Sequence, residues 1–251
     1  MFTDTHCHIH ESDYPLDSGD VYRRAIEANV KHMICVGTSE ASSRAAKKFA
    51  SHYNGVYAAV GVHPHDTKYG YDAIAELAKN DVIAVGEIGL DYFYNHSPRD
   101  MQISALESQI QTALDNDLPI IFHVRDAFDD FWPIFDNFRS ASRRIRGVLH
   151  SFTDVRANLD KGFERELYVG VNGISTFTKD SVQQQLYKDI PLEKMVLETD
   201  APFLTPAPYR GTINEPTFVS EIARHHAAIR GIDIETVAQA TTANAITLFN
   251  L

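Results

Sequence analysis

The segment Val82–Leu90 reads VIAVGEIGL and is apolar along nearly its whole length, with Glu87 as its one charged residue. A strand with apolar residues on both faces is typical of a parallel sheet that helices cover on both sides. A carboxylate buried in such a strand is costly unless it has a partner. The segment therefore predicts a buried parallel strand that carries a functional group near its carboxyl end.

Segments of this kind recur along the whole chain and alternate with amphipathic segments of helical spacing. The predicted strands are 1–8, 32–38, 56–64, 82–90, 119–125, 146–152, 167–173 and 195–202. The predicted helices include 18–30, 97–117, 178–190, 214–230 and 233–250. For the second of these, Ser97 is the expected N-cap and Pro98 the expected first helical residue. No low-complexity linker interrupts the pattern, so we expect a single domain over residues 1–251.

Eight strand–helix repeats predict a parallel (β/α)8 barrel, an α/β fold of the TIM-barrel type. The alternative is a doubly wound open sheet. That alternative is less favoured because the sequence has no clear glycine-rich dinucleotide loop.

Titratable residues gather near the carboxyl ends of the predicted strands, which in a barrel converge on one face. These residues are His6, His8, His63, Glu87, His123, His150 and Asp200. A single histidine in a barrel is most often a hydrogen-bonded core residue. Several histidines and two carboxylates at one mouth are costly to bury without a partner, and imidazole and carboxylate are metal ligands. The pattern predicts a metal site.

Alternation along the first strand separates residues that are close in sequence, because side chains at i and i+2 share a face. His6 and His8 are expected to face the barrel interior, and Cys7 the surrounding helices. His10 lies past the strand end and is either a site residue or a solvated loop histidine. Asp4 shares the inward parity, and it either orients a ligand histidine or binds the backbone.

The composition limits the classes of function. The net charge of −11 argues against broad adhesion to nucleic acid or to an anionic membrane, although it leaves room for a local cationic site. Arg125 and Arg210 are candidates for holding a phosphate or carboxylate, while surface ion pairs are the commoner role of an arginine. Cys7 and Cys35 are expected to be free thiols in a reducing compartment. We expect a cytoplasmic protein without a membrane-spanning segment.

Taken together, the motifs resemble those of the TatD-type metal-dependent deoxyribonucleases of the amidohydrolase superfamily. The resemblance rests on DTHCH (4–8), GVHPH (61–65), VGEIGLDY (85–92), FHVRDA (122–127), LHSF (149–152), ETDAPFL (198–204) and RGTINEP (210–216). It implies a (β/α)8 barrel with two divalent metal ions. The first would be held by His6, His8 and Asp200, and the second by His123 and His150, with Glu87 bridging the two.

The resemblance also implies hydrolysis of DNA by a metal-activated water, typically as a 3′-5′ exonuclease on single-stranded or damaged strands. His63, His65 and Arg125 would then lie near the scissile phosphate. We expect Asp200 to accept the proton of the nucleophile, with His63 assisting. The histidine-rich ligand set favours Zn, Mn, Ni or Fe over Mg, although family members are commonly described as Mg-dependent. We expect a monomer or a weak oligomer.

Two departures from the family pattern weaken the expected contact with DNA. Ser151 and Asp154 stand where the family often has cysteine and glycine, and Thr212 and Ile213 replace two basic residues. Fewer cations near the mouth favour an alternative function, a small-molecule amidohydrolase or lactonase on the same barrel. A non-enzymatic metal-binding scaffold is the third hypothesis, and the presence of all six expected ligands speaks against it.

Overall fold

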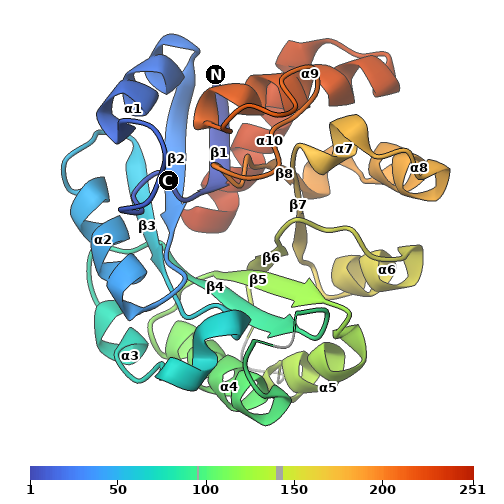
Figure 1. Ribbon diagram of the computed structural model, residues 1–251. Coiled ribbons are helices and arrows are strands. Elements are labelled where there is room, and N and C mark those ends of the chain that lie inside the picture. The colour runs from blue at the N-terminus through green and yellow to red at the C-terminus, as the bar shows by residue number, and fades with distance from the viewer. Residues whose placement is uncertain (95, 140–143) are drawn as a thin grey trace.

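Eight parallel strands surround a common axis in the computed structural model, which describes residues 1–94, 96–139 and 144–251. Each strand pairs with the next in sequence, in the order β1 to β8 (Figure 1). The strands are β1 (Phe2–Cys7), β2 (Val30–Val36), β3 (Val56–Val60), β4 (Ala84–Asp91), β5 (Ile120–Arg125), β6 (Gly147–Leu149), β7 (Tyr168–Val171) and β8 (Met195–Leu197). The predicted (β/α)8 barrel is confirmed, and the open doubly wound sheet is wrong because the strand order never reverses.

Backbone hydrogen bonds connect β1 to the segment that follows β8. The amide of Asp200 donates to the carbonyl of His6 over 2.8 Å, and the amide of His8 donates to the carbonyl of Ala201 over 2.8 Å. The first and last strands therefore meet at their carboxyl ends. This contact brings Asp200 beside His6 on β1 and His8 just after it.

Helices cover the outside of the barrel (Figure 1). They are α1 (Ser18–Glu27), α2 (Glu40–Ala50), α3 (Ile74–Leu77), α4 (Arg99–Asp115), α5 (Phe128–Phe138), α6 (Arg156–Glu164), α7 (Ile174–Phe177), α8 (Ser181–Asp189), α9 (Val219–Arg230) and α10 (Ile234–Phe249). Short 3-10 helices lie at η1 (Pro64–Tyr69), η2 (Leu192–Lys194) and η3 (Pro216–Phe218). None of the described helices is long and apolar enough to cross a membrane.

The start of α4 differs from the prediction by one residue. Pro98 is the N-cap and Arg99 the first helical residue, so Ser97 lies outside the helix. The Ser97 hydroxyl donates instead to the carbonyl of His65 over 2.6 Å. The Ser97 side chain therefore binds a residue distant in sequence instead of capping the helix.

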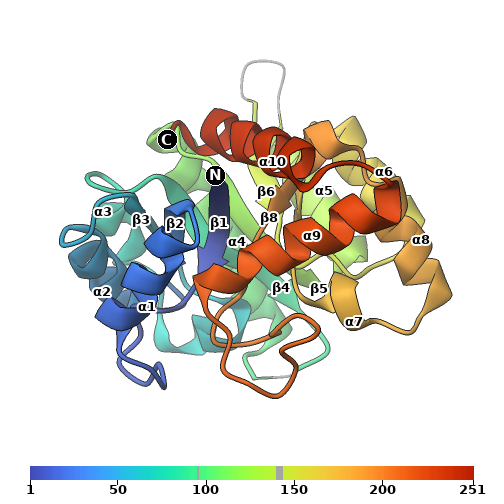
Figure 2. The same cartoon turned by 90° about the horizontal axis from the view of Figure 1, so that it is seen from above.

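Two apolar cores divide the barrel into an inside and an outside. The inner core contains Ile34, Val36, Ala59, Ala84, Ile121, Val148 and Val196 from the strands and Ala245, Leu248 and Phe249 from α10. Figure 2 shows α10 lying across the end of the barrel where both chain termini lie. Since α10 fills the end where the strands begin, the opposite end is left for polar side chains.

Glycines let β4 approach β5 on either side of Glu87. A Cβ atom at Gly86 would lie 2.5 Å from the Cβ of Ile121, and one at Gly89 would lie 1.7 Å from the carbonyl oxygen of His123. Side chains at these positions would force the two strands apart. The close approach sets Glu87 next to His123.

Candidate metal centre

A cavity of about 670 Å³ opens at the carboxyl ends of the strands. Its lining includes most of the residues that the sequence assigns to the site: His8, His63, His65, Glu87, His123, Arg125, His150 and Asp200. His6 is fully buried beneath them. Strands from all round the barrel contribute, as their carboxyl ends converge.

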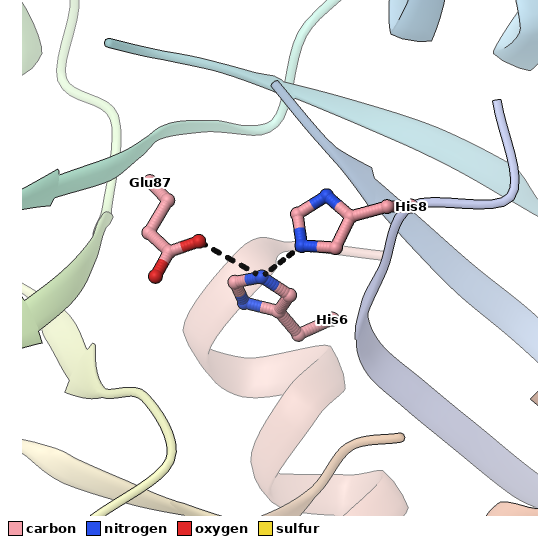
Figure 3. Close-up of side chains that lie close together, drawn as sticks. All are labelled: His6, His8 and Glu87. Atoms are coloured by element: carbon pink, nitrogen blue, oxygen red, sulfur yellow. Dashed lines mark hydrogen bonds and ion pairs between the residues drawn. The ribbon is translucent and has the colours of Figure 1, made fainter. Parts of the chain in front are cut away.

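His6, His8, Glu87 and Asp200 form one side of the cluster. The Nε2 atoms of His6 and His8 lie 3.1 Å apart, and the Oε2 of Glu87 is 3.2 Å from the Nε2 of His6 (Figure 3). The Oδ1 of Asp200 lies 3.4 Å from the Nε2 of His8 and 3.7 Å from that of His6. The Nδ1 of His8 contacts the carbonyl of Val36 over 2.9 Å, which leaves Nε2 to face the cluster.

Glu87 connects this side to the other one. Its Oε2 faces His6, whereas its Oε1 lies 2.7 Å from the Nδ1 of His123, 3.6 Å from the Nε2 of His63 and 3.7 Å from the Nε2 of His150. The two oxygens of one carboxylate thus face two separate groups of histidines. This is the arrangement that a bridging ligand requires.

Burial and neighbouring charges shift the pKa values of the clustered side chains in opposite directions. Burial would raise the pKa of the Glu87 carboxyl, but His150, His63 and His6 hold that pKa well below its usual range. Burial would lower the pKa of the two imidazoles on the other side, but nearby carboxylates raise the pKa of His123 to about 9 and that of His150 to about 10. The surroundings of Glu87 thus favour its charged form, which protonated imidazoles or metal ions would stabilise.

The donor set fits a divalent metal ion. Ligand atoms bound to one ion at about 2.0–2.2 Å lie about 3 to 3.5 Å apart. The contacts of His6 with His8 and with Glu87 fall in this range. Within the described residues, three groups bring their donor atoms within 4.8 Å of one another. They are His6–His8–Glu87, His6–His150–Glu198 and His63–Glu87–His123. Mixed imidazole and carboxylate donors suit Zn, Mn, Ni or Fe.

Glu198 supports the site and was missed by the sequence reasoning. It is buried at the end of β8, where its Oε1 lies 2.9 Å from the Nδ1 of His150 and accepts from the amide of Ser151 over 2.7 Å. A carboxylate on the outer nitrogen of a ligand histidine fixes the orientation of its ring. Its position two residues before Asp200, with the same strand parity, was the available signal.

Asp91 is the second residue that the sequence reasoning missed. It is buried, and its Oδ2 lies 3.0 Å from the Nε2 atoms of both His123 and His65. Its Oδ1 accepts from the amides of Phe93 and Tyr94 over 3.0 and 2.9 Å. One carboxylate therefore holds two histidines and the loop that follows β4. Its parity with Glu87 along the same strand was the signal.

Three residues near His6 and His8 do not join the cluster. Asp4 accepts from the amides of His6 and Thr199, so it binds backbone rather than an imidazole; burial raises its pKa to about 8. Cys7 packs in the outer core and its thiol donates to the carbonyl of Ile34. His10 is buried rather than solvated, with Nε2 3.2 Å from the hydroxyl of Ser42, so the solvated-loop expectation is wrong.

The residues predicted to contact substrate lie in different places. His65 and Arg125 line the cavity. Arg210 is not part of that lining, because its Nη1 donates to the carbonyl of Thr205 over 2.8 Å and its guanidinium carbon lies 3.8 Å from the centre of the Phe177 ring.

The departures from the family pattern have small effects on the cavity itself. Ser151 lines it, but the carboxylate of Asp154 is directed to the start of α6, where it accepts from the side chain of Asn158 over 2.6 Å. Thr212 and Ile213 lie outside the lining. Among the described lining residues, Arg125 is the one arginine and no lysine is present.

A family description fits this arrangement. The sequence model described as "TatD related DNase" matches residues 3–250. The chain belongs to this family. The TatD-related relatives include a protein named "3'-5' ssDNA/RNA exonuclease TatD" from Salmonella typhimurium, which is 36% identical over 96% of this chain and 95% of its own length. An "Uncharacterized metal-dependent hydrolase YabD" from Bacillus subtilis is 34% identical over the full length of both chains.

Solved structures agree with this placement in the TatD family. The crystal structure of YJJV, a TatD homologue from Escherichia coli K12, superposes with a TM-score of 0.89 at 30% identity, covering 100% of this chain and 98% of that one. An organophosphorus hydrolase from Deinococcus radiodurans shares the fold alone, with a TM-score of 0.65 at 14% identity, over 99% of this chain and 92% of that one. The chain is a TatD-type metal-dependent hydrolase.

Proposed function

We propose that the protein is a nuclease that removes nucleotides from the 3′ end of single-stranded or damaged DNA. The observation that carries the proposal is the bridging position of Glu87, whose two oxygens face two groups of histidines at the floor of an open cavity. The relative that bears the name of a 3′-5′ single-strand exonuclease supports the choice of substrate. A cavity of about 670 Å³ suits one end of a strand better than a long duplex.

Two sets of residues would hold divalent metal ions. His6, His8 and Asp200 form the first set, His123 and His150 the second, and Glu87 belongs to both; His63 lies close enough to join the second. When bound, such ions lower the pKa of water and stabilise charge that develops on the phosphoryl group.

The residues of the chain perform the remaining steps. Asp200 would accept a proton from the attacking water at its carboxylate, because it lines the cavity and its Oδ1 faces His6 and His8. His63 lines the cavity beside Glu87 and would contact a non-bridging phosphate oxygen or assist the leaving oxygen. Arg125 would orient the phosphate, as the one arginine of the described lining.

A small-molecule amidohydrolase or lactonase is the second candidate. The observation in its favour is the scarcity of cations at the cavity, because the described part of its lining offers a single arginine to a phosphate backbone. The same floor residues would then activate water toward a carbonyl carbon.

A substrate panel separates the two candidates. The metal-loaded protein is incubated with a short single-stranded oligonucleotide, a lactone and a cyclic amide, and the products are quantified. We expect hydrolysis of the oligonucleotide alone. Turnover of the lactone or amide with an intact oligonucleotide would overturn the proposal.

Elemental analysis of untreated protein should find a transition metal, and the absence of such a metal would overturn the proposed ligand set.

A further inference from the structure

Two neighbouring aromatic side chains lie exposed beside the cavity. Phe93 and Tyr94 lie two and three residues after the end of β4 and are 55% and 43% exposed. Exposed apolar groups that cluster beside a cavity mark binding surfaces more often than isolated ones do. Their ring centres lie 4.7 Å apart, with the planes at 82°.

The segment that carries these rings is fixed in place. The Oδ1 of Asp91 accepts from the backbone amides of both Phe93 and Tyr94, and its Oδ2 contacts His123 in the candidate metal centre. The ring of His65 lies 5.5 Å from that of Tyr94. A binding surface held by such contacts loses little conformational freedom when a ligand docks.

Arg125 connects the rings to the cavity. Its guanidinium carbon lies 4.0 Å from the centre of the Phe93 ring and 4.9 Å from that of Tyr94. Arg125 lines the cavity and has no ion pair within residues 1–94, 96–139 and 144–251. Stacking on the rings thus positions its charge beside the place where a phosphate would lie.

We infer that Phe93, Tyr94 and Arg125 form a subsite for an unpaired nucleobase and its phosphate, which we call the aromatic platform. The inference rests on the proposed nuclease function and specifies its substrate class. A base next to the cleaved bond stacks on the exposed rings, and Arg125 contacts the adjoining phosphate. Bases inside a duplex are already stacked on each other, so the platform favours single strands.

The charge of the protein explains why stacking is needed. With a net charge of −11 and one arginine in the described cavity lining, long-range attraction of a polyanion is weak. Stacking of a base on an aromatic side chain requires no net positive charge on the protein and changes affinity about 5- to 150-fold per base. Affinity for strand ends should therefore depend strongly on the presence of the bases.

The test compares two fluorescein-labelled single-stranded oligonucleotides by fluorescence anisotropy. One carries normal bases, and the other has abasic tetrahydrofuran residues at its 3′ end; phosphorothioate linkages at that end slow cleavage. We expect the unaltered protein to bind the base-bearing end about ten-fold more tightly. Phe93→Leu and Tyr94→Leu should remove this preference. They should weaken binding of the abasic strand much less, through the lost stacking of Arg125.

Matched variants control the experiment. Tyr94→Phe keeps the ring and should retain the preference. Tyr168→Leu removes an aromatic side chain at the start of β7, where the ammonium group of Lys194 lies 5.5 Å from the ring, and should have no effect. Thermal unfolding checks that each variant is folded.

Equal binding of the two strands by the unaltered protein would overturn the platform, and so would an equal loss on both strands in Phe93→Leu and Tyr94→Leu. Cleavage of an unmodified strand is measured separately. Base-dependent binding without cleavage would uphold the platform and overturn the nuclease function. Cleavage without a base preference in binding would uphold the nuclease function and overturn the platform.

Discussion

At the scale of single residues, the site depends on carboxylates that each have a different task. Glu87 faces both groups of histidines, Asp200 faces the first group, and Asp91 and Glu198 hold the outward nitrogens of His123 and His150. Side chains of the same chemical type thus separate into groups that could bind metal and groups that orient the ligands. The position of each on its strand decides which task it has.

Replacing Asp200 by asparagine tests its role as proton acceptor. Asparagine has nearly the same shape and keeps one oxygen, but it cannot take up a proton. We expect the rate of phosphodiester hydrolysis to fall about 10²- to 10⁴-fold, while elemental analysis still finds bound metal. Full activity with metal bound would show that Asp200 is not the base.

Replacing Asp91 by asparagine tests the support of His123. The amide nitrogen of asparagine cannot accept a hydrogen bond. It therefore breaks either the contacts of Oδ2 with His65 and His123 or the hydrogen bonds that Oδ1 accepts from the backbone of Phe93 and Tyr94. We expect kcat/KM or metal affinity to fall about 10- to 100-fold. The control is Asp100→Asn, an exposed acidic residue in the first turn of α4, which should leave both unchanged. Equal effects of the two substitutions would contradict the assigned role.

At the scale of elements, one ion pair fastens the first helix to the loop that carries the last motif. The Nη2 of Arg24 on α1 lies 2.5 Å from the Oε2 of Glu215, next to η3, and Nε donates to the same oxygen over 2.9 Å. Glu215 is nearly buried, whereas the guanidinium of Arg24 is partly exposed. The pair links α1 to the segment that follows β8.

Breaking this pair should lower stability because Glu215 keeps its buried carboxylate without a cation. We expect Arg24→Gln to lower the free energy of unfolding by about 1–2 kcal/mol. Arg23→Gln on the same helix removes an exposed pair with Asp20 and should change it by less than about 0.5 kcal/mol. Denaturant unfolding measures both. Equal losses would contradict the link.

The sequence predicts elements well where periodicity controls them and poorly where tertiary contacts do. The strands follow from apolar runs, and the separation of His6 from Cys7 follows from strand parity. Ser97 shows the limit, because a partner distant in sequence, His65, decides what its hydroxyl does. Strand parity could have placed Glu198 at the barrel mouth, but it could not show that its partners are His150 and the backbone amide of Ser151, the latter 47 residues away in sequence. Asp154 lies outside the cavity lining because Asn158 and the start of α6 hold its carboxylate.

At the scale of the whole molecule, the residues that stabilise the barrel and the residues that could perform chemistry lie at opposite ends of it. Apolar side chains and α10 fill the end where the strands begin, and the ionisable cluster occupies the other end. That cluster joins residues from β1 to the end of β8. Ions bound there would hold together strands that are far apart in sequence.

Removing metal should therefore destabilise the fold. At a free concentration a hundred times the Kd, a bound ion adds about 2.7 kcal/mol, which in a chain of this size corresponds to roughly 5–10 °C in Tm. We expect a chelator to lower Tm by this amount and added Mn or Zn to restore it. A Tm that does not respond to the chelator would contradict metal binding at the cluster.

The most direct test of the account follows single-stranded DNA that is labelled at its 5′ end. Metal-loaded protein is mixed with the strand, and the products are separated by length over time, with Asp200→Asn as the inactive comparison. We predict a ladder that shortens progressively from the 3′ end and a much slower reaction on a blunt duplex. An intact strand with every metal tested, or cleavage that starts inside the strand, would contradict the account.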